Sequence, residues 1–187
     1  MKIAILFGSI RIGRQTERFA HCLTNHFNNL PGIEATLIDL AKTPLPMMEE
    51  RIRLHPNPPE NLLTIGQILR DANAIVLLSP EYHGSYSGVL KNALDYFGAE
   101  FVRKAVGVAT ASAGKLGGIN ASTLLQQLIL PLGGYPMPYK LLISGIAQAF
   151  DENNLPIEEQ VQKNIAKFAD ELLWLAQALE RQKMASQ

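Results

Sequence analysis

The feature that most constrains the fold is a set of short apolar runs, each of which ends in a polar, glycine-containing loop. Residues 3–7 and 74–78 are aliphatic and rich in β-branched side chains, without the polar alternation of a half-exposed strand. Such runs are typical of parallel strands that are buried on both faces. We therefore expect the loops that follow them, 8–14 and 79–85, to lie at strand carboxyl ends, the edge where open parallel sheets bind ligands.

The rest of the chain alternates between strand and helix patterns. Strands are predicted over 3–7, 33–40, 74–79, 105–109 and 139–143, and helices over 15–29, 60–71, 88–97, from 119 to about 132, and through the apolar stripe from Ile157 to Leu179. The proline-rich segment 41–59 is expected to be a long irregular loop, which is either functional or a tolerated insertion.

Five strands that alternate with five helices predict an α/β fold, a three-layer sandwich with helices on both faces of a five-stranded parallel sheet. The flavodoxin-like strand order 2-1-3-4-5 explains the pattern best. It places the partly polar second strand and the fifth strand, which follows Pro136 and Pro138, at the two edges. We expect residues 1–187 to form one domain, because 47% of the residues are hydrophobic and no linker divides the chain.

Charge and cysteine content exclude several classes of function. Seventeen basic residues balance seventeen acidic ones, so no overall field would attract nucleic acid or an anionic membrane. Cys22 is the only cysteine, which excludes an internal disulfide and a four-cysteine metal site; its spacing from His26 indicates packing rather than a metal site. Because no apolar stretch reaches about 20 residues and no signal sequence is evident, we expect a cytoplasmic protein without a membrane partner.

The loop after the first strand can be compared with known phosphate motifs. Gly8 and Gly13 have the spacing of a P-loop, but Arg14 and Gln15 stand where nucleoside triphosphatases need lysine and a magnesium-binding hydroxyl. ATP with magnesium is therefore not expected, and no metal is needed. The loop also lacks the Gly-x-Gly-x-x-Gly pattern with which dinucleotide sites approach a pyrophosphate.

A single phosphate fits this loop better. Its predicted ligands are a hydroxyl, two guanidinium groups and the free N–H groups of a helix start, supplied by Ser9, Arg11, Arg14, Gln15 and Thr16. The alternative interpretation is an ordinary strand-to-helix turn with exposed arginines. The motif alone favours this plainer interpretation, because short motifs often occur by chance.

Two other loops offer what a planar ring system would need. After the third strand, Tyr82 offers an aromatic ring to pack on a heterocycle, and after the fourth strand the amides of 114–118 form a donor-rich nest. One phosphate and one planar ring with oxygen atoms at its edge indicate FMN. The predicted flavin-binding residues of these two loops are Pro80, Glu81, Tyr82, His83, Gly84, Ser85, Ser112, Gly114 and Gly117.

Two motifs resemble those of a known flavodoxin-like family, the NADPH-dependent FMN reductases, which include NAD(P)H:quinone, azo-dye and chromate reductases. The first motif is Gly8-Ser9-x-Arg11-x-Gly13-Arg14. The second and more specific motif is Pro80-Glu81-Tyr82, followed after two positions by Ser85 and then by Gly88-x-Leu90-Lys91-Asn92-Ala93-x-Asp95. The resemblance covers nearly the whole chain. It implies a homodimer or homotetramer with FMN near the subunit interface, and NADPH or NADH as the electron donor.

Three positions depart from the family's pattern. Many members have serine at position 14, where Arg14 adds a cation that favours an anion. Asparagine commonly follows the Pro-Glu-Tyr sequence, whereas this chain has His83, an imidazole that titrates near neutral pH. Proline commonly precedes Gly88, so Ser87 in its place predicts a looser start of the following helix.

The expected reaction is ping-pong: NADPH or NADH reduces bound FMN and leaves, and a quinone, free flavin, azo compound or similar acceptor then takes the same position. Because the flavin carries the chemistry, no catalytic side chain is required, although His83 and Tyr82 are candidates for protonating a reduced quinone. Two other classes of function are compatible with an FMN site: an FMN-binding electron carrier, and a redox-sensing interaction module whose flavin state controls partner binding.

Overall fold

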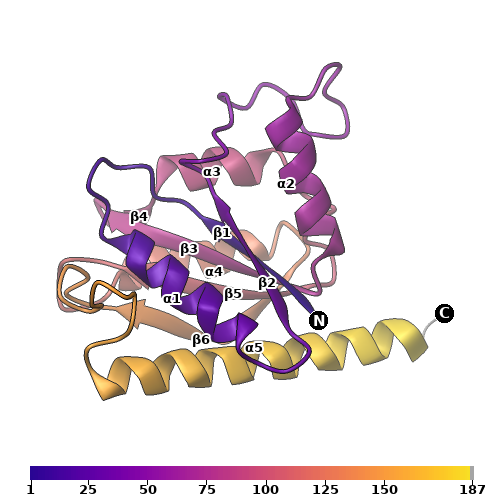
Figure 1. Ribbon diagram of the computed structural model, residues 1–187. Coiled ribbons are helices and arrows are strands. Elements are labelled where there is room, and N and C mark those ends of the chain that lie inside the picture. Colours follow the sequence, from indigo (N-terminus) through magenta and orange to yellow (C-terminus); the bar gives the residue numbers. More distant parts are fainter. Residues whose placement is uncertain (186–187) are drawn as a thin grey trace.

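The computed structural model describes residues 1–185, which form three layers (Figure 1). Within these residues five parallel strands make the central layer in the order β2-β1-β3-β5-β6: β1 (Lys2–Phe7), β2 (Glu34–Asp39), β3 (Ala74–Tyr82), β5 (Ala105–Ala111) and β6 (Tyr135–Ile143). The short strand β4 (Ser85–Tyr86) pairs antiparallel with the end of β3. For the parallel strands alone, this is the predicted order 2-1-3-4-5, so the flavodoxin-like prediction is confirmed.

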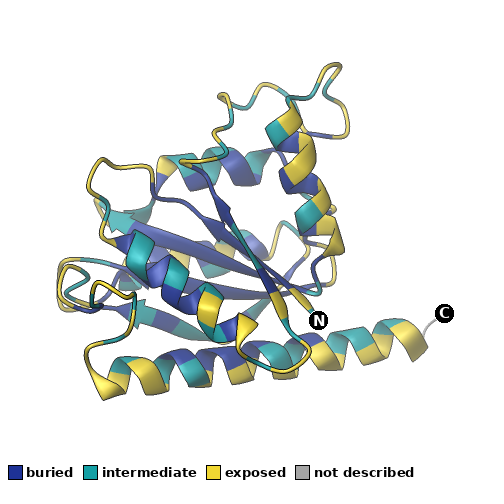
Figure 2. Ribbon diagram, viewed as in Figure 1, coloured by how far each residue is buried: buried dark blue, intermediate teal, exposed yellow. Residues whose placement is uncertain are grey.

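Helices cover both faces of the sheet. The helices α1 (Thr16–Asn28) and α5 (Glu159–Ala185) pack on one face, and α2 (Glu60–Asp71), α3 (Gly88–Asp95) and α4 (Ile119–Ile129) pack on the other. The strands between these layers are buried along most of their length (Figure 2), and all seven residues of β5 are buried. This double burial explains why the central strands are apolar without alternation.

A helix that spans a membrane must be long and apolar, so we compared the helices of residues 1–185 with this requirement. The longest, α5, extends at its C-terminal end beyond the start of β1 (Figure 1). Neither α5 nor any shorter helix within residues 1–185 combines the length and apolar character needed to cross a bilayer.

The two edge strands carry the polar residues and prolines that the sequence predicts for them. β2 lies at one edge and β6 at the other. β6 begins earlier than predicted, at Tyr135, and therefore contains Pro136 and Pro138 within the strand. An edge strand tolerates proline because one of its sides has no ladder partner, and the pairing with β5 shifts register between Val106 and Val108.

Two other boundaries differ from the sequence prediction. β3 continues through Tyr82, because residues 79–85 form a hairpin rather than an open loop. His83 and Gly84 form its two-residue turn with φ values of 51° and 76°, the backbone of a type I′ turn. At the other end of the chain, α5 begins at Glu159, and Ile157, which the apolar stripe includes, precedes the helix and is exposed.

The segment 41–59 contains neither helix nor strand, as its prolines predict, but it is tied to α3. The Asn92 side chain accepts a hydrogen bond from the Met48 N–H at 2.8 Å and donates one to the Pro46 carbonyl at 2.7 Å. The Tyr96 hydroxyl donates to the same carbonyl at 3.2 Å. Hydrogen bonds to Asn92 and Tyr96 thus hold this irregular loop against α3 and its C-cap.

Ser87 secures the start of α3, so the prediction of a looser helix start is wrong. Its hydroxyl accepts a hydrogen bond from the Leu90 N–H at 3.3 Å and donates one to the Gly8 carbonyl. Its own N–H donates to the Ser79 hydroxyl at 3.0 Å, a bond that proline at this position would lack. Ser87 is therefore a buried N-cap that also links α3 to the loop after β1.

We expect Ser87→Ala to lower the free energy of unfolding by about 1–3 kcal/mol, because it removes the N-cap and leaves the Gly8 carbonyl without its donor. Urea denaturation followed by circular dichroism measures this change. Ser144→Ala is the control, since Ser144 is exposed and its hydroxyl has no bond within residues 1–185; its effect should stay within about 0.5 kcal/mol. Equal stability of the two variants would contradict the capping role.

Candidate functional site

The candidate site lies where the strands end, at the left-hand end of the molecule in Figure 1. A cavity of about 250 Å³ opens there between the segments that follow β1, β3, β5 and β6. The predicted site residues that line it are Ser9, Arg11, Arg14, Gln15, Thr16, Pro80, Glu81, Tyr82 and Ser112. The structure thus brings residues from three predicted loops together around one cavity.

Other predicted site residues lie outside the lining of this cavity. His83, Gly84 and Ser85 belong to the hairpin beyond Tyr82, so of the two predicted proton donors only Tyr82 reaches the cavity. Gly114 and Gly117 follow the lining residues in the loop after β5 and do not join them. A Cβ atom on Gly117 would lie 2.9 Å from the backbone of β6, so close packing explains this glycine.

The structure adds lining residues that the sequence analysis did not select. They are Gly13, Ala111, Ala113, Ile146 and Ala147. Ile146 and Ala147 come from the segment after β6, which is held beside the loop after β5: the Ser112 N–H donates to the Ile143 carbonyl, and the Ile146 N–H donates to the Ser112 carbonyl, both at 3.1 Å. The sequence could have indicated these two residues by their position after a predicted strand, because all the parallel strands end on the same side of the sheet.

Ser9 carries a buried hydroxyl whose hydrogen-bonding capacity is not used by the described residues. The residue is 1% exposed, and its hydroxyl is the one buried side-chain polar atom within residues 1–185 that has no hydrogen-bond partner. Leaving a buried hydroxyl unpaired costs about 1–3 kcal/mol. Since Ser9 lines the cavity, an oxygen atom of a bound group would satisfy it, and a phosphate fits this requirement.

The start of α1 supplies further donors beside Ser9. Gln15 is the N-cap residue, and no side chain of the described structure caps this end of the helix. The N–H groups of the first turn have no intrahelical partner, and the helix dipole places a partial positive charge there. Gln15 and Thr16 both line the cavity, so this end of α1 suits an anion such as a single phosphate.

Arg11 lies beside the cavity with its charge unpaired. Its guanidinium carbon is 5.8 Å from the centre of the Tyr82 ring, and no carboxylate within residues 1–185 forms an ion pair with it. An arginine held against an aromatic ring but free of carboxylates can take up a phosphate oxygen without breaking an existing ion pair. This placement fits the predicted role of Arg11.

Arg14 has a different environment, although it also lines the cavity. Its guanidinium carbon lies 4.9 Å from the centre of the Phe7 ring. It donates to the two carboxylate oxygens of Asp39 at 2.6 and 2.5 Å and to Glu17 at 2.9 Å, and it also donates to the Ser9 carbonyl. The hydrogen bond to Asp39 is the main cause of the raised pKa of Arg14. The sequence pattern predicts that Arg14 binds the phosphate, but Asp39 and Glu17 already balance its positive charge.

The Glu81 side chain is engaged in a structural contact. One of its carboxylate oxygens accepts hydrogen bonds from the Asn120 and Ala121 N–H groups, both at 3.0 Å. These groups belong to the first turn of α4, so Glu81 caps that helix from the end of β3. Glu81 lines the cavity, but its carboxylate is held by α4.

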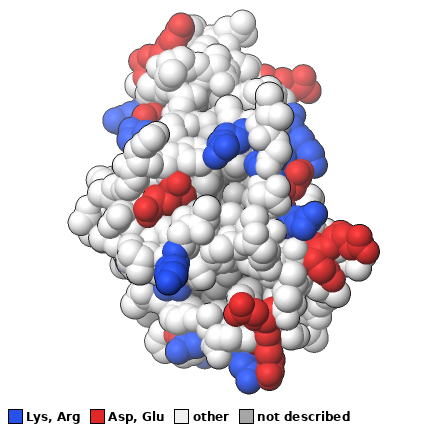
Figure 3. All heavy atoms as spheres, turned by 90° about the vertical axis from the view of Figure 1, so that its left-hand side faces the viewer, with Lys and Arg blue, Asp and Glu red and all other residues white. Residues whose placement is uncertain are grey.

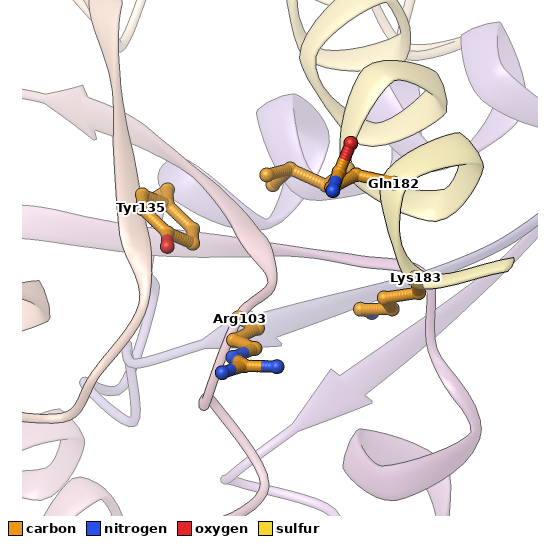
Figure 4. A pocket seen from close by; sticks show the side chains of 5 residues that line it. Arg103, Tyr135, Gln182 and Lys183 are labelled. Atoms are coloured by element: carbon orange, nitrogen blue, oxygen red, sulfur yellow. The ribbon is translucent and has the colours of Figure 1, made fainter. Parts of the chain in front are cut away.

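A second cavity, of about 270 Å³, lies between the end of α5, the turn before β5 and the start of β6 (Figure 4). Its lining consists of Arg103 from the turn before β5, Tyr135 from the start of β6, and Leu179, Gln182 and Lys183 from the end of α5. None of the predicted site residues lies in it. The two cavities therefore lie at opposite ends of the strands, the first beyond their C-terminal ends and the second at the N-terminal ends of β5 and β6.

The predicted packing role of Cys22 fits its surroundings. The thiol is 8% exposed within the core between α1 and the sheet, and burial raises its pKa to about 11. Cys22 and His26 line a cavity of about 190 Å³. No group of three or more metal-ligating side chains occurs there or elsewhere in residues 1–185.

The strand order defines a flavodoxin-like fold, and its cavity lies at the strand ends, where such folds bind their ligands. The sequence model of the NADPH-dependent FMN reductase family matches residues 1–148, and the chain belongs to this family. An FMN-dependent NADPH-azoreductase of Staphylococcus aureus (strain USA300) is 31% identical over 187 aligned residues, which cover 92% of this chain and 94% of the relative. An FMN-dependent NADPH-azoreductase of Staphylococcus saprophyticus is 37% identical over 133 residues, 70% of this chain and 68% of the relative.

Solved structures share the fold at lower sequence identity. The flavoenzyme NAD(P)H:(acceptor) oxidoreductase of Paracoccus denitrificans superposes with a TM-score of 0.73 at 22% identity, covering 96% of this chain and 97% of that one. A flavodoxin from Pseudomonas aeruginosa superposes with a TM-score of 0.58 at 18% identity, covering 92% and 99%. Both confirm the flavodoxin-like fold.

We expect Ser9→Ala to weaken ligand binding without lowering the stability of the protein. Without ligand, the free energy of unfolding should stay the same or rise by about 1 kcal/mol, because the variant removes an unpaired buried hydroxyl. The affinity for FMN should fall about 10-fold, since the phosphate loses one hydrogen bond. Urea denaturation and titration of FMN fluorescence measure the two effects. An FMN affinity equal to that of the unaltered protein would exclude Ser9 as a phosphate ligand.

The native Cys22 thiol should react slowly with a thiol-specific disulfide reagent at pH 8. A pKa of about 11 leaves about 10²-fold less thiolate than an unperturbed cysteine has, and burial slows the reaction further. The reaction should reach the rate of a free cysteine in denaturing guanidinium chloride, as followed by absorbance. Rapid modification of the folded protein would contradict this account.

Proposed function

We propose that this protein transfers electrons from NADPH or NADH, through FMN held in the cavity at the strand ends, to a quinone, free flavin, azo compound or similar small acceptor. As a member of the NADPH-dependent FMN reductase family, it is an FMN-dependent oxidoreductase that uses NAD(P)H. The observation that carries the placement of FMN is the buried, unpaired Ser9 hydroxyl beside the uncapped start of α1. The ping-pong order and the choice of acceptor are our proposal.

The FMN phosphate is assigned to the loop after β1. The Ser9 hydroxyl and the free N–H groups at the start of α1 would donate to its oxygens, and Arg11 would neutralise part of its charge from the rim. These donors all come from the short segment 9–16, so they could converge on a single phosphate.

The ring system is assigned to the segments after β3 and β5. Pro80 and Ala111 are paired neighbours in these strands, so Tyr82 and Ser112 follow from adjacent positions at the same edge. Small side chains at Ala111 and Ala113 leave room for a planar ring. Bound FMN supplies the hydride chemistry, and the protein's part is to bind, orient and hold donors beside the ring, which needs no nucleophilic side chain.

Charge favours an enzyme over an electron carrier that docks by electrostatic attraction. The face that holds the strand ends shows both blue and red side chains and no large area of one sign (Figure 3). Carriers typically present a surface of one sign to their partners. A face of mixed charge suits small-molecule acceptors better than it suits a charged protein partner.

We also propose a homodimer or homotetramer in the cytoplasm, with FMN near a subunit interface. Residues 8–14, to which we assign the phosphate, are called the phosphate loop. Its Ile10 and Ile12 are 55% and 102% exposed, and apolar side chains so exposed beside a site support a subunit interface there. The reducing cytosol supplies NADPH and keeps the single thiol, Cys22, reduced.

The test is an anaerobic absorbance measurement on the purified protein, reconstituted with FMN and freed of excess flavin. One equivalent of NADPH should bleach the bound flavin's band at about 450 nm within seconds, and a quinone added afterwards should restore it. The same protein without NADPH is the control for spontaneous reduction.

The outcomes separate the classes of function. Flavin that stays bound but oxidised would contradict the enzyme and favour the carrier or the redox sensor. Protein that retains no flavin after reconstitution would overturn the placement of FMN in this cavity.

A further inference from the structure

We propose that Arg14 and Asp39 form a clamp that holds the phosphate loop in its binding conformation, so that Arg14 positions the loop and is not itself a phosphate ligand. This inference rests on the proposed function, because it assigns the cavity beside Ser9 to the FMN phosphate. It replaces the role that the sequence pattern indicates for Arg14.

The hydrogen-bonding capacity of Arg14 is nearly used up inside the protein. A guanidinium has five N–H donors. Nη1 donates to Oδ1 of Asp39 and to the Ser9 carbonyl, and Nη2 donates to Oδ2 of Asp39 and to Oε1 of Glu17. Only Nε–H is left, and a single hydrogen cannot grip a phosphate in the forked manner for which arginine is suited.

The pair is also buried, which makes its exchange for a phosphate unfavourable. The Arg14 and Asp39 side chains are 10% and 5% exposed, and the Phe7 ring covers one face of the guanidinium. Burial raises the pKa of the Asp39 carboxyl, but hydrogen bonds from Arg14 and from the Ala41 N–H outweigh it and bring the pKa below its usual value. Asp39 is therefore charged at neutral pH, and turning Arg14 toward the cavity would strand that charge.

The clamp acts on the residue that carries the unpaired hydroxyl. Arg14 holds the Ser9 carbonyl, and the neighbouring Gly8 is held from the other side, where its N–H donates to the Leu78 carbonyl at 2.8 Å and its carbonyl accepts from the Ser87 hydroxyl. The backbone of the loop is thus fixed at Gly8 and Ser9. With the backbone fixed in this way, Ser9 stays at the cavity, and its hydroxyl has no hydrogen-bond partner within residues 1–185.

The clamp also neutralises carboxylates that would otherwise repel a phosphate. Asp39 and Glu17 both contact Arg14, and Lys42 lies at 3.8 and 3.7 Å from them. With Arg14 in place these charges are balanced. Without it, a buried carboxylate would face the phosphate loop with only an exposed lysine nearby.

The test is the FMN affinity of Asp39→Asn, measured at pH 7 by fluorescence titration of the flavin-free protein. If Arg14 were a phosphate ligand, Asp39→Asn would free it and remove a negative charge, so FMN would bind more tightly. The clamp predicts the opposite sign. FMN should bind about 10-fold more weakly, because Ser9 loses its fixed position and the phosphate loses a well-placed hydrogen bond.

Two further variants keep the test decisive. Asp71→Asn is the matched control: Asp71 also accepts a side-chain hydrogen bond, from Gln67 at 2.8 Å, but lies at the end of α2 before β3, so FMN affinity should not change. If Asp39→Asn does not fold, Asp39→Glu replaces it. Glutamate keeps the charge but shifts the carboxylate by one methylene, so the clamp predicts weaker FMN binding, whereas an Arg14 that binds the phosphate predicts equal or tighter binding.

A flavin-free measurement separates this inference from the proposed function. Inorganic phosphate should raise the melting temperature of the unaltered protein and of Asp71→Asn, and should raise that of Asp39→Asn less. This pattern in a protein that fails to bind FMN would overturn the proposed function but support the clamp. Tighter FMN binding by Asp39→Asn, or equal stabilisation of all three proteins by phosphate, would overturn the clamp.

Discussion

Burial of the parallel sheet on both faces is the constraint on which the rest of the structure depends. With α1 and α5 on one face and α2, α3 and α4 on the other, the strands leave no room for polar chemistry along their length. Ligand-binding groups must then stand where the strands end, and the cavity lies there. The fold thus confines the site to short segments whose backbones need external support.

That support comes from polar side chains that reach across the ends of the strands. Ser87 ties the loop after β1 to α3, Glu81 ties the end of β3 to α4, and Arg14 ties the loop after β1 to Asp39 at the end of β2. Each contact satisfies a helix end, a carbonyl or a buried charge as well as joining two segments. The cavity wall is therefore fixed by groups that do not themselves need to contact a ligand.

The layers and the strand order could be predicted from the sequence because unbroken apolar runs and helical stripes report local burial. The same signals placed Ser9, Arg11 and Tyr82 at the cavity. They could not show that Arg14 faces Asp39, because a guanidinium suits a phosphate and a carboxylate equally well and only the tertiary fold selects between them. The hairpin after β3 was missed because its turn carries His83 where asparagine gives the usual signal.

The contacts of Ser87 have a consequence for local opening of the protein. Through the Gly8 carbonyl and the Ser79 hydroxyl, this one residue joins the loop after β1, the end of β3 and the first turn of α3. None of the three can separate from the others without breaking a buried hydrogen bond. They therefore belong to one cooperative unit, so their amide hydrogens should exchange with solvent through a shared opening rather than through independent fraying of each loop.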